Sequence, residues 1–266
     1  METSDLTTPA TGGEQDVPLR IRRTASFQRW YAAQRNAGNS LVGARPVWTS
    51  TPGEEPSKQP GKQPGEKLGA EPGAVFFWAL HVRMHVAAED RIKDNEVVIS
   101  RPDVSVVALY RPGLSLDETV VVLVREFRSP ASTSDGYVHE LPGGSSPATA
   151  TDAAGPDSLT QAVDEVAEET GLRVDPRRFR AHGSGQVAAT VSAHHAHLFS
   201  VEITDDELAW LRTRRDRPHG VEADSERTWV EIATYAEIRA ARLVDWATLG
   251  MLAEALAPAE TGTRAH

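Results

Sequence analysis

Residues 157–172, DSLTQAVDEVAEETGL, carry the clearest structural signal in the chain. Apolar residues recur there at the three- and four-residue spacing that places them on one face of an α-helix. These residues are Leu159, Ala162, Val163, Val166 and Ala167. Ser158 and Gln161 have the spacing of a capping box, and Gly171 stands where glycine commonly follows the last turn of a helix. The sequence therefore predicts a helix over residues 158–170.

The opposite face of this predicted helix is acidic. It carries Asp164, Glu165, Glu168 and Glu169, and no Lys or Arg occurs between residues 157 and 172. Each like-charged i,i+4 pair costs a few tenths of a kcal/mol, and the helix dipole disfavours negative charge near the C-terminus. A divalent cation would offset this repulsion, and Mg²⁺ takes carboxylate oxygens together with substrate phosphates. The alternative interpretation is a solvated acidic face.

Apolar and β-branched runs on both sides of this helix predict a series of strands. They are expected at 75–86, 97–99, 104–110, 119–125, 137–141, 197–202 and 228–232. Further helices are expected at 204–214, 235–242 and 246–256. The turn residues Pro112 and Gly113 predict a hairpin between strands 104–110 and 119–125. This mixture of elements indicates an α+β fold or an α-β-α sandwich.

The composition of the 266 residues excludes several classes of protein. The chain has no cysteine, which excludes a disulfide-stapled module, a thiolate zinc site and a cysteine nucleophile. The net charge of −10 argues against a nucleic-acid partner. No apolar run approaches the roughly 18 residues of a membrane span, and the N-terminus lacks the pattern of a secretory signal. We therefore expect a cytoplasmic protein that binds neither nucleic acid nor membranes.

A Pro/Gly-rich stretch divides the chain. Ten of the 24 residues from 50 to 73 are Pro or Gly, and Lys-Gln-Pro-Gly occurs twice. We expect a flexible linker over 50–74, because such a segment buries too little apolar area to offset its ordering entropy. Residues 1–49 are then an N-terminal tail, partly disordered, whose aromatic and basic cluster forms either a docking helix or a disordered segment. The main domain is expected at 75–257, followed by a disordered tail at 258–266.

Residues 144–172 resemble the Nudix box. The second half of that box reads Arg-Glu-apolar-x-Glu-Glu-x-Gly-apolar, and it stands here as DEVAEETGL at 164–172. Asp164 replaces the arginine, and Pro156 stands at the position of the first glutamate of the box. The spacing from Gly144 to Asp164 is 20 residues, six more than in the standard box. The box is therefore degenerate and extended.

Four more blocks are similar to ADP-ribose and nucleotide-sugar pyrophosphatases and occur in the same order. They are LVREFRSP at 123–130, ELPGG at 140–144, GVEADSE at 220–226 and LVDWAT at 243–248. The resemblance covers roughly residues 75–256. It implies a Nudix fold, an α-β-α sandwich with a mixed sheet, preceded here by a flexible N-terminal region.

The resemblance also implies roles for individual residues. The metal ligands would be Glu165, Glu169, Glu226 and the carbonyl of Gly143. The catalytic carboxylates would be Glu168, Asp224 and Glu222, of which the last two lie in the acidic loop. Substrate contacts would come from Arg125, Arg128, Glu140 and His194. Arg125 and Arg128 are also candidates to balance the charge of Asp164. For the cluster His194, His195 and His197 we favour a pocket-lining or structural role over a metal site.

The implied activity is Mg²⁺-dependent hydrolysis of the pyrophosphate bond of a nucleoside diphosphate derivative, such as ADP-ribose or a nucleotide sugar. Mn²⁺ is a possible substitute, the products are a nucleoside monophosphate and a sugar phosphate, and the resemblance implies a homodimer. The alternative is a catalytically weak or inactive Nudix module that binds a nucleotide as a sensor or scaffold, as the changes at Asp164 and Pro156 suggest. A third interpretation gives the N-terminal tail a role in dimerisation only.

Overall fold

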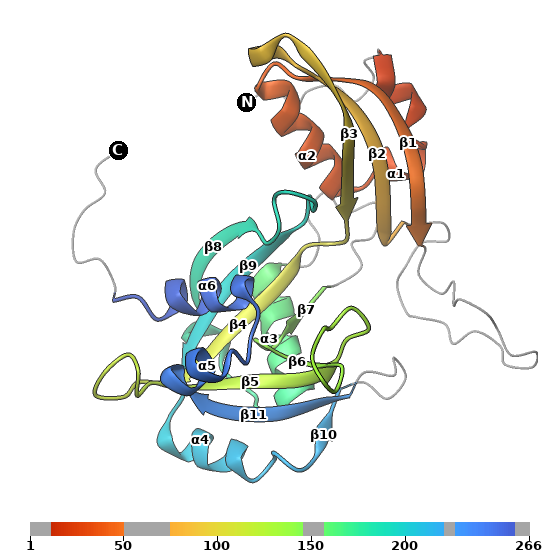
Figure 1. The fold of residues 1–266 in the computed structure, drawn as a ribbon. Helices are drawn as coiled ribbons and strands as arrows, with labels where there is room; N and C mark the ends of the chain where they lie inside the picture. Colours follow the sequence, from red (N-terminus) through yellow and green to blue (C-terminus); the bar gives the residue numbers. More distant parts are fainter. Residues whose placement is uncertain (1–11, 51–74, 146–156, 221–226, 259–266) are drawn as a thin grey trace, which may run out of the picture. The chain divides into compact units, whose positions relative to one another are not determined.

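The computed structural model describes residues 12–50, 75–145, 157–220 and 227–258 and divides the chain into two compact units (Figure 1). The N-terminal unit contains the described residues up to Asp103 together with 186–194. The C-terminal unit contains the other described residues from Val104 onward. This division differs from the expected start of the main domain at residue 75. The reason is that Ser40–Ser50 pairs with Phe77–Val86 across the Pro/Gly-rich stretch, a long-range contact that local patterning does not report.

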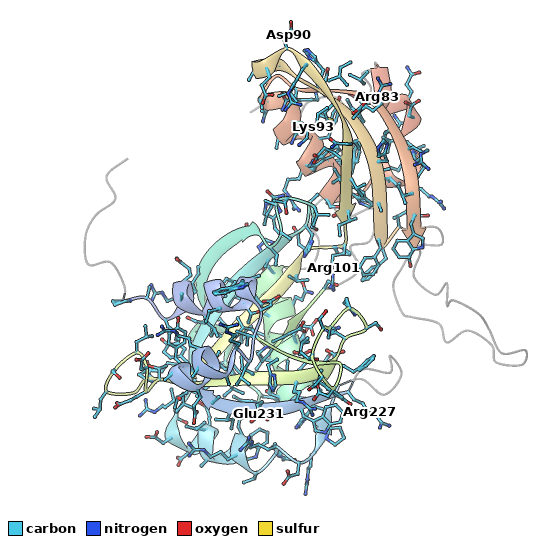
Figure 2. The ribbon with its side chains drawn as sticks, in the orientation of Figure 1. Arg83, Asp90, Lys93, Arg101, Arg227 and Glu231 are labelled. Atoms are coloured by element: carbon cyan, nitrogen blue, oxygen red, sulfur yellow. The ribbon has the colours of Figure 1, made fainter. Side chains whose placement is uncertain are left out.

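The N-terminal unit is a three-stranded antiparallel sheet with helices on one face. Its strands follow the order β1-β2-β3, and Figure 2 labels Arg83 on β2 and Lys93 on β3. The bounds are η1 Gly12–Asp16, α1 Leu19–Arg22, α2 Ala25–Asn36, β1 Ser40–Ser50, β2 Phe77–Val86, η2 Ala87–Glu89 and β3 Arg91–Ser100. The segment before residue 50 therefore includes both a docked helix and an edge strand.

The core of the N-terminal unit lies between α2 and alternate residues of β2. Trp78, Leu80 and Val82 are buried on this face of β2, where period-two alternation places them. Phe27 and Tyr31 of α2 pack in the same cluster. The indole Nε1–H of Trp78 donates to Ser26 Oγ at 3.1 Å, so the one polar atom of this buried ring is satisfied.

We expect Trp78→Phe to lower the free energy of unfolding of the N-terminal unit by about 1–2 kcal/mol. The smaller ring leaves part of the core unfilled and removes the hydrogen bond to Ser26. Trp48→Phe is the matched control, because Trp48 is 55% exposed and exposed substitutions usually change stability by less than about 0.5 kcal/mol. Urea denaturation, monitored by circular dichroism, measures the unfolding free energy of both variants. Equal losses of stability in Trp78→Phe and Trp48→Phe would contradict the packing described.

The C-terminal unit is built on a mixed sheet with strand order β10-β11-β5-β4-β9-β8. β4 and β9 are parallel, whereas β5 is antiparallel to both β4 and β11. The short β6 pairs with β5, and the two-residue β7 pairs with β4. The bounds are β4 Val104–Arg111, β5 Val120–Phe127, β6 Tyr137–Glu140, β7 Gly143–Gly144, β8 Arg180–Gln186, β9 His195–Glu202, β10 Pro218–His219 and β11 Thr228–Thr234.

Helices pack against both faces of this sheet. In Figure 1 α3 lies behind the sheet, and α5 and α6 lie in front of it; α3 and α6 both contact β4 and β9. β4 is accordingly buried over five consecutive residues, as expected for a strand covered on both sides. The bounds are α3 Ser158–Thr170, η3 Pro176–Arg178, α4 Asp205–Arg212, α5 Tyr235–Ala241 and α6 Trp246–Ala255. The expected α+β class and the β4–β5 hairpin are confirmed.

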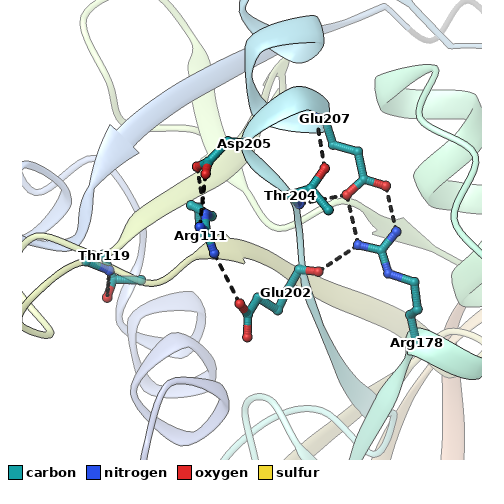
Figure 3. Close-up of polar contacts among 8 residues, drawn as sticks. Arg111, Thr119, Arg178, Glu202, Thr204, Asp205 and Glu207 are labelled. Carbon is teal, nitrogen blue, oxygen red and sulfur yellow. Dashed lines mark hydrogen bonds and ion pairs between the residues drawn. The ribbon is translucent and has the colours of Figure 1, made fainter.

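The N-terminus of α4 is held by ion pairs that join it to η3 and β4 (Figure 3). Glu207 completes a capping box with Thr204 and accepts two bonds from Arg178, at 2.6 and 2.8 Å. Arg111 of β4 forms a second pair with Asp205 at 2.8 Å. No helix in the described part of the chain is long and apolar enough to cross a membrane.

Glu207 makes the stability of α4 depend on pH. The hydrogen bonds from Arg178 are the main cause that lowers the pKa of Glu207 to about 2 from its ordinary value of 4.5. A carboxyl group whose pKa is lower in the folded state than in the unfolded state stabilises the fold at pH values above its unfolded pKa. This stabilisation is lost as pH falls toward 2. We expect the difference in unfolding free energy between wild type and Glu207→Gln to be about 1–2 kcal/mol at pH 6 and to vanish near pH 2. A difference in thermal stability between wild type and Glu207→Gln that stays the same at every pH would contradict this expectation.

Candidate functional site

The glycine pair of β7 brings the backbone unusually close to β4. Gly143 pairs with Val106 and Gly144 with Ser105. A Cβ at Gly143 would lie 2.3 Å from the carbonyl oxygen of Ser105, a distance that no side chain can occupy. Glycine is therefore required for this approach. The motif ELPGG thus ends in a strand whose backbone lies beside α3.

Two carboxylates of α3 lie against this glycine pair. Glu169 Oε2 accepts a hydrogen bond from the N–H of Gly143 at 2.8 Å. A Cβ at Gly144 would lie 2.3 Å from Glu165 Oε1, so the Glu165 carboxylate occupies the space that a side chain there would need. Glu165 and Glu169 are four residues apart and share one side of the helix. The structure thus brings together Gly143, Glu165 and Glu169, three of the four expected metal ligands.

Glu169 is buried, with 8% of its surface exposed. Desolvation by this burial raises the pKa of Glu169 well above its ordinary value, and the charges of Glu165 and Glu126 raise it further. The N–H of Gly143 and the positive charge of Arg128 act in the opposite direction but do not offset the burial. The site therefore holds a buried carboxyl whose ionised form is poorly compensated by the protein's own groups.

Arg128 is the cation of this cluster. Its guanidinium lies 2.9 Å from carboxylate oxygens of both Glu126 and Glu140. Burial alone would lower the pKa of Arg128, but the charges of Glu140, Glu126 and Glu169 outweigh it and raise the pKa. Asp164, which stands where the Nudix box has arginine, is exposed on α3. Positive charge therefore reaches the site from the segment after β5 rather than from the helix.

Arg125 does not join this cluster. It hydrogen-bonds Asp135 at 2.8 Å, and its guanidinium stacks over the ring of Tyr137 at 4.0 Å from the centroid. Because successive strand residues point to opposite faces, Arg125 lies on the other side of β5 from Glu126. Its expected role as a substrate contact beside Arg128 therefore finds no support in its position.

The other expected site residues fall into three groups. Glu168 is exposed on α3, and its backbone carbonyl accepts the N–H of Gly220 at 3.1 Å. Glu222, Asp224 and Glu226 lie outside the described residues. His194 belongs to the N-terminal unit, where its ring bonds the hydroxyl of Ser192.

The expected capping box of α3 is wrong, and its residues serve the site instead. Asp157 caps the helix by accepting the N–H of Leu159 at 3.3 Å. Ser158 is the first helical residue, and its carbonyl accepts the hydroxyl of Ser105 at 2.8 Å. The side chain of Gln161 donates to the carbonyl of Gly144 at 2.6 Å, which ties β7 to the helix. The Gln161 amide is buried and is therefore used across the core rather than at the cap.

Sequence reasoning missed Glu126 and Gln161 as members of the site. Glu126 is buried with 8% exposure and contributes negative charge beside Glu169. A signal existed, because Glu126 is the only acidic residue in the apolar strand β5, and a charge in such a strand is seldom buried without a partner. For Gln161, no pattern distinguished a contact with Gly144 from the capping box.

The donor atoms of this site suit Mg²⁺, although no complete ligand set is formed. Within residues 12–50, 75–145, 157–220 and 227–258, no group of three or more His, Asp or Glu is placed to hold a metal ion. Mg²⁺ commonly takes only one or two carboxylates from protein, with water and substrate phosphates as its other ligands. The poorly compensated charge at Glu169 is the observation that fits a cation, because a positive charge there would favour the ionised carboxylate.

Comparison with known proteins adds no family assignment. No protein-family model matches the chain, and no curated protein matches it. We therefore infer the function from the residues and their geometry.

Proposed function

We propose that the C-terminal unit hydrolyses the pyrophosphate bond of a nucleoside diphosphate derivative with the help of Mg²⁺. The observation that carries the proposal is the placement of Glu165 and Glu169 against the Gly143–Gly144 backbone, with Glu169 buried and poorly compensated. A buried charge cluster of this kind is costly to stability and is characteristic of functional sites. The resemblance to ADP-ribose pyrophosphatases supplies the reaction class.

Each described residue of the site has a part in this proposal. Glu165 and Glu169 would hold the cation, and the N–H of Gly143 orients the Glu169 carboxylate. When bound, Mg²⁺ neutralises charge on the phosphate oxygens and orients the attacking water. Arg128 fixes Glu140 and Glu126 through its two ion pairs. Glu168 is exposed on the same helical turn, and among the described residues it is our candidate for the general base.

A nucleotide-binding module without turnover is the second candidate. The observation that favours it is Asp164, which is exposed on α3 and adds negative charge where the Nudix box has arginine. Arg128 supplies positive charge from the segment after β5, so the glutamates of α3 are not oriented by an arginine on the helix, as they would be in the Nudix box. Such a module would bind the nucleotide but leave its pyrophosphate bond intact.

A substrate panel distinguishes the two candidates. Purified full-length protein is incubated with ADP-ribose, GDP-mannose, UDP-glucose, NADH or diadenosine polyphosphates, with Mg²⁺, Mn²⁺ or EDTA, and the products are separated by chromatography. The proposal expects metal-dependent release of a nucleoside monophosphate from at least one compound. Saturable binding without product from any of them would favour the binding module, and the absence of both would reject the two candidates.

A further inference from the structure

The sheet of the N-terminal unit has a second face that the helices do not cover. Trp78, Leu80 and Val82 point toward α2, so Ala79 and His81 point to the opposite, open face. The strand register places Trp48 and Ile99 on either side of Ala79, and Arg45 and Val97 on either side of His81. Paired residues of antiparallel strands point to the same face. We call this surface the open face.

Aromatic and apolar side chains are exposed at one end of the open face. Trp48 is 55% exposed, Val97 is 41% exposed and Ile99 is 40% exposed. The rings of Trp48 and Phe77 lie 6.1 Å apart, and the guanidinium of Arg101 lies 5.6 Å from the centre of the Phe77 ring. The rings of Trp48 and Phe77 therefore form an aromatic surface with the guanidinium of Arg101 beside it.

The open face carries two exposed arginines. Arg45 of β1 pairs in register with His81, and Arg83 of β2 lies two residues beyond His81 on the same face, in a chain with a net charge of −10. β1 and β2 contain no acidic residue, and β3 contains Asp94 and Glu96, of which Glu96 is paired with Lys93. Arg45 and Arg83 are exposed, and within the described residues neither takes part in an ion pair. At the edge of β1, Asp16 is already engaged, since its carboxylate accepts the N–H of Ala44 at 3.3 Å.

We propose that the open face binds single-stranded nucleic acid. Exposed rings on a sheet stack unpaired bases, and arginines along the same surface contact the phosphates. The net charge of −10 describes the whole chain and does not prevent Arg45 and Arg83 from contacting phosphates. A second copy of the chain fits less well, because two such faces would bring arginines together without a carboxylate from β1 or β2. The proposal is independent of the site on α3.

Fluorescence anisotropy tests the proposal with the full-length protein and a labelled oligothymidylate of about 20 nucleotides. We expect binding that weakens as salt increases. Trp48→Ala should weaken it about tenfold through the loss of stacking, and Trp48→Phe should retain most of it. The double variant Arg45→Ala/Arg83→Ala should reduce the slope of log affinity against log salt by about 1.4, because each phosphate contact on a single strand contributes about 0.7.

Two exposed residues of the C-terminal unit provide matched controls. Trp246→Ala removes a ring that is 86% exposed on α6, and Arg177→Ala removes an arginine whose side chain is 89% exposed. Both should bind the oligonucleotide as wild type does. Absence of binding at low salt, or equal losses in the controls, would overturn the proposal. So would a dimer that light scattering shows to dissociate on Trp48→Ala while oligonucleotide binding is unchanged, since the face would then join two copies.

Discussion

Glu169→Gln should reduce turnover of the pyrophosphate substrate by about 10²–10³-fold, while the protein remains as stable in EDTA as wild type or becomes more stable. The amide keeps the shape of the carboxylate and can still accept the N–H of Gly143. It carries no charge, so it cannot favour a cation, and loss of such a transition-state interaction costs on the order of 10²–10³-fold or more. Burial already disfavours the ionised form of Glu169, so neutralising it relieves a cost in the metal-free protein.

Asp164→Asn is the matched control for this variant. It removes one negative charge from the same helix, but at an exposed position, and we expect turnover to change by less than about threefold. Steady-state kinetics with saturating Mg²⁺ and thermal melts in EDTA measure the two properties separately. Comparable losses of turnover in both variants would show that the total charge of α3, rather than the buried carboxylate, determines activity.

Gly144→Ala should reduce turnover by about 100-fold with little loss of stability. The added Cβ would meet the Glu165 carboxylate at 2.3 Å, and this flexible side chain must move away. A displacement of about 1 Å at a catalytic position is enough for a loss of this size. The substitution leaves Glu165 chemically intact, so it tests the position of the carboxylate rather than its presence.

Gly185→Ala is the control for the glycine substitution, because a Cβ at Gly185 meets nothing within 4 Å. We expect Gly185→Ala to retain wild-type turnover. Gly144→Ala at higher Mg²⁺ concentration should recover part of its activity if the displaced Glu165 weakens metal binding. Wild-type turnover in Gly144→Ala would contradict the contact between β7 and Glu165 as a requirement for the site.

Much of the C-terminal unit could be predicted because its elements have strong local patterns. The expected helix at 158–170 matches α3, and Gly171 has the predicted left-handed conformation with φ of 75°. Local patterning failed for β1, in which Gly43 and Pro46 accompany two register shifts and obscure the alternation. It also failed for β8, which is polar and contains two glycines. Neither strand has the apolar periodicity from which strands are recognised.

The site was predictable only where it depends on local helical spacing. Helical spacing placed Glu165 and Glu169 on one side of the helix, as a candidate cation site on the face opposite the buried stripe. Glu169 is three residues after Val166 and seven after Ala162, so it also borders the buried stripe, and β7 covers it. The covering strand β7 ends 14 residues before α3 begins. Only tertiary structure could show that Glu169 is buried and that Arg128 lies beside it while Arg125 does not.

Binding of Mn²⁺ to the full-length protein, measured by titration calorimetry in the absence of substrate, tests directly whether α3 and β7 form a metal site. Mn²⁺ takes the same hard oxygen ligands as Mg²⁺, and the measurement does not require the substrate to be known. We expect a binding site in wild type that is lost in Glu169→Gln and retained in Asp164→Asn. Equal affinity in wild type and Glu169→Gln would show that α3 and β7 do not form the metal site.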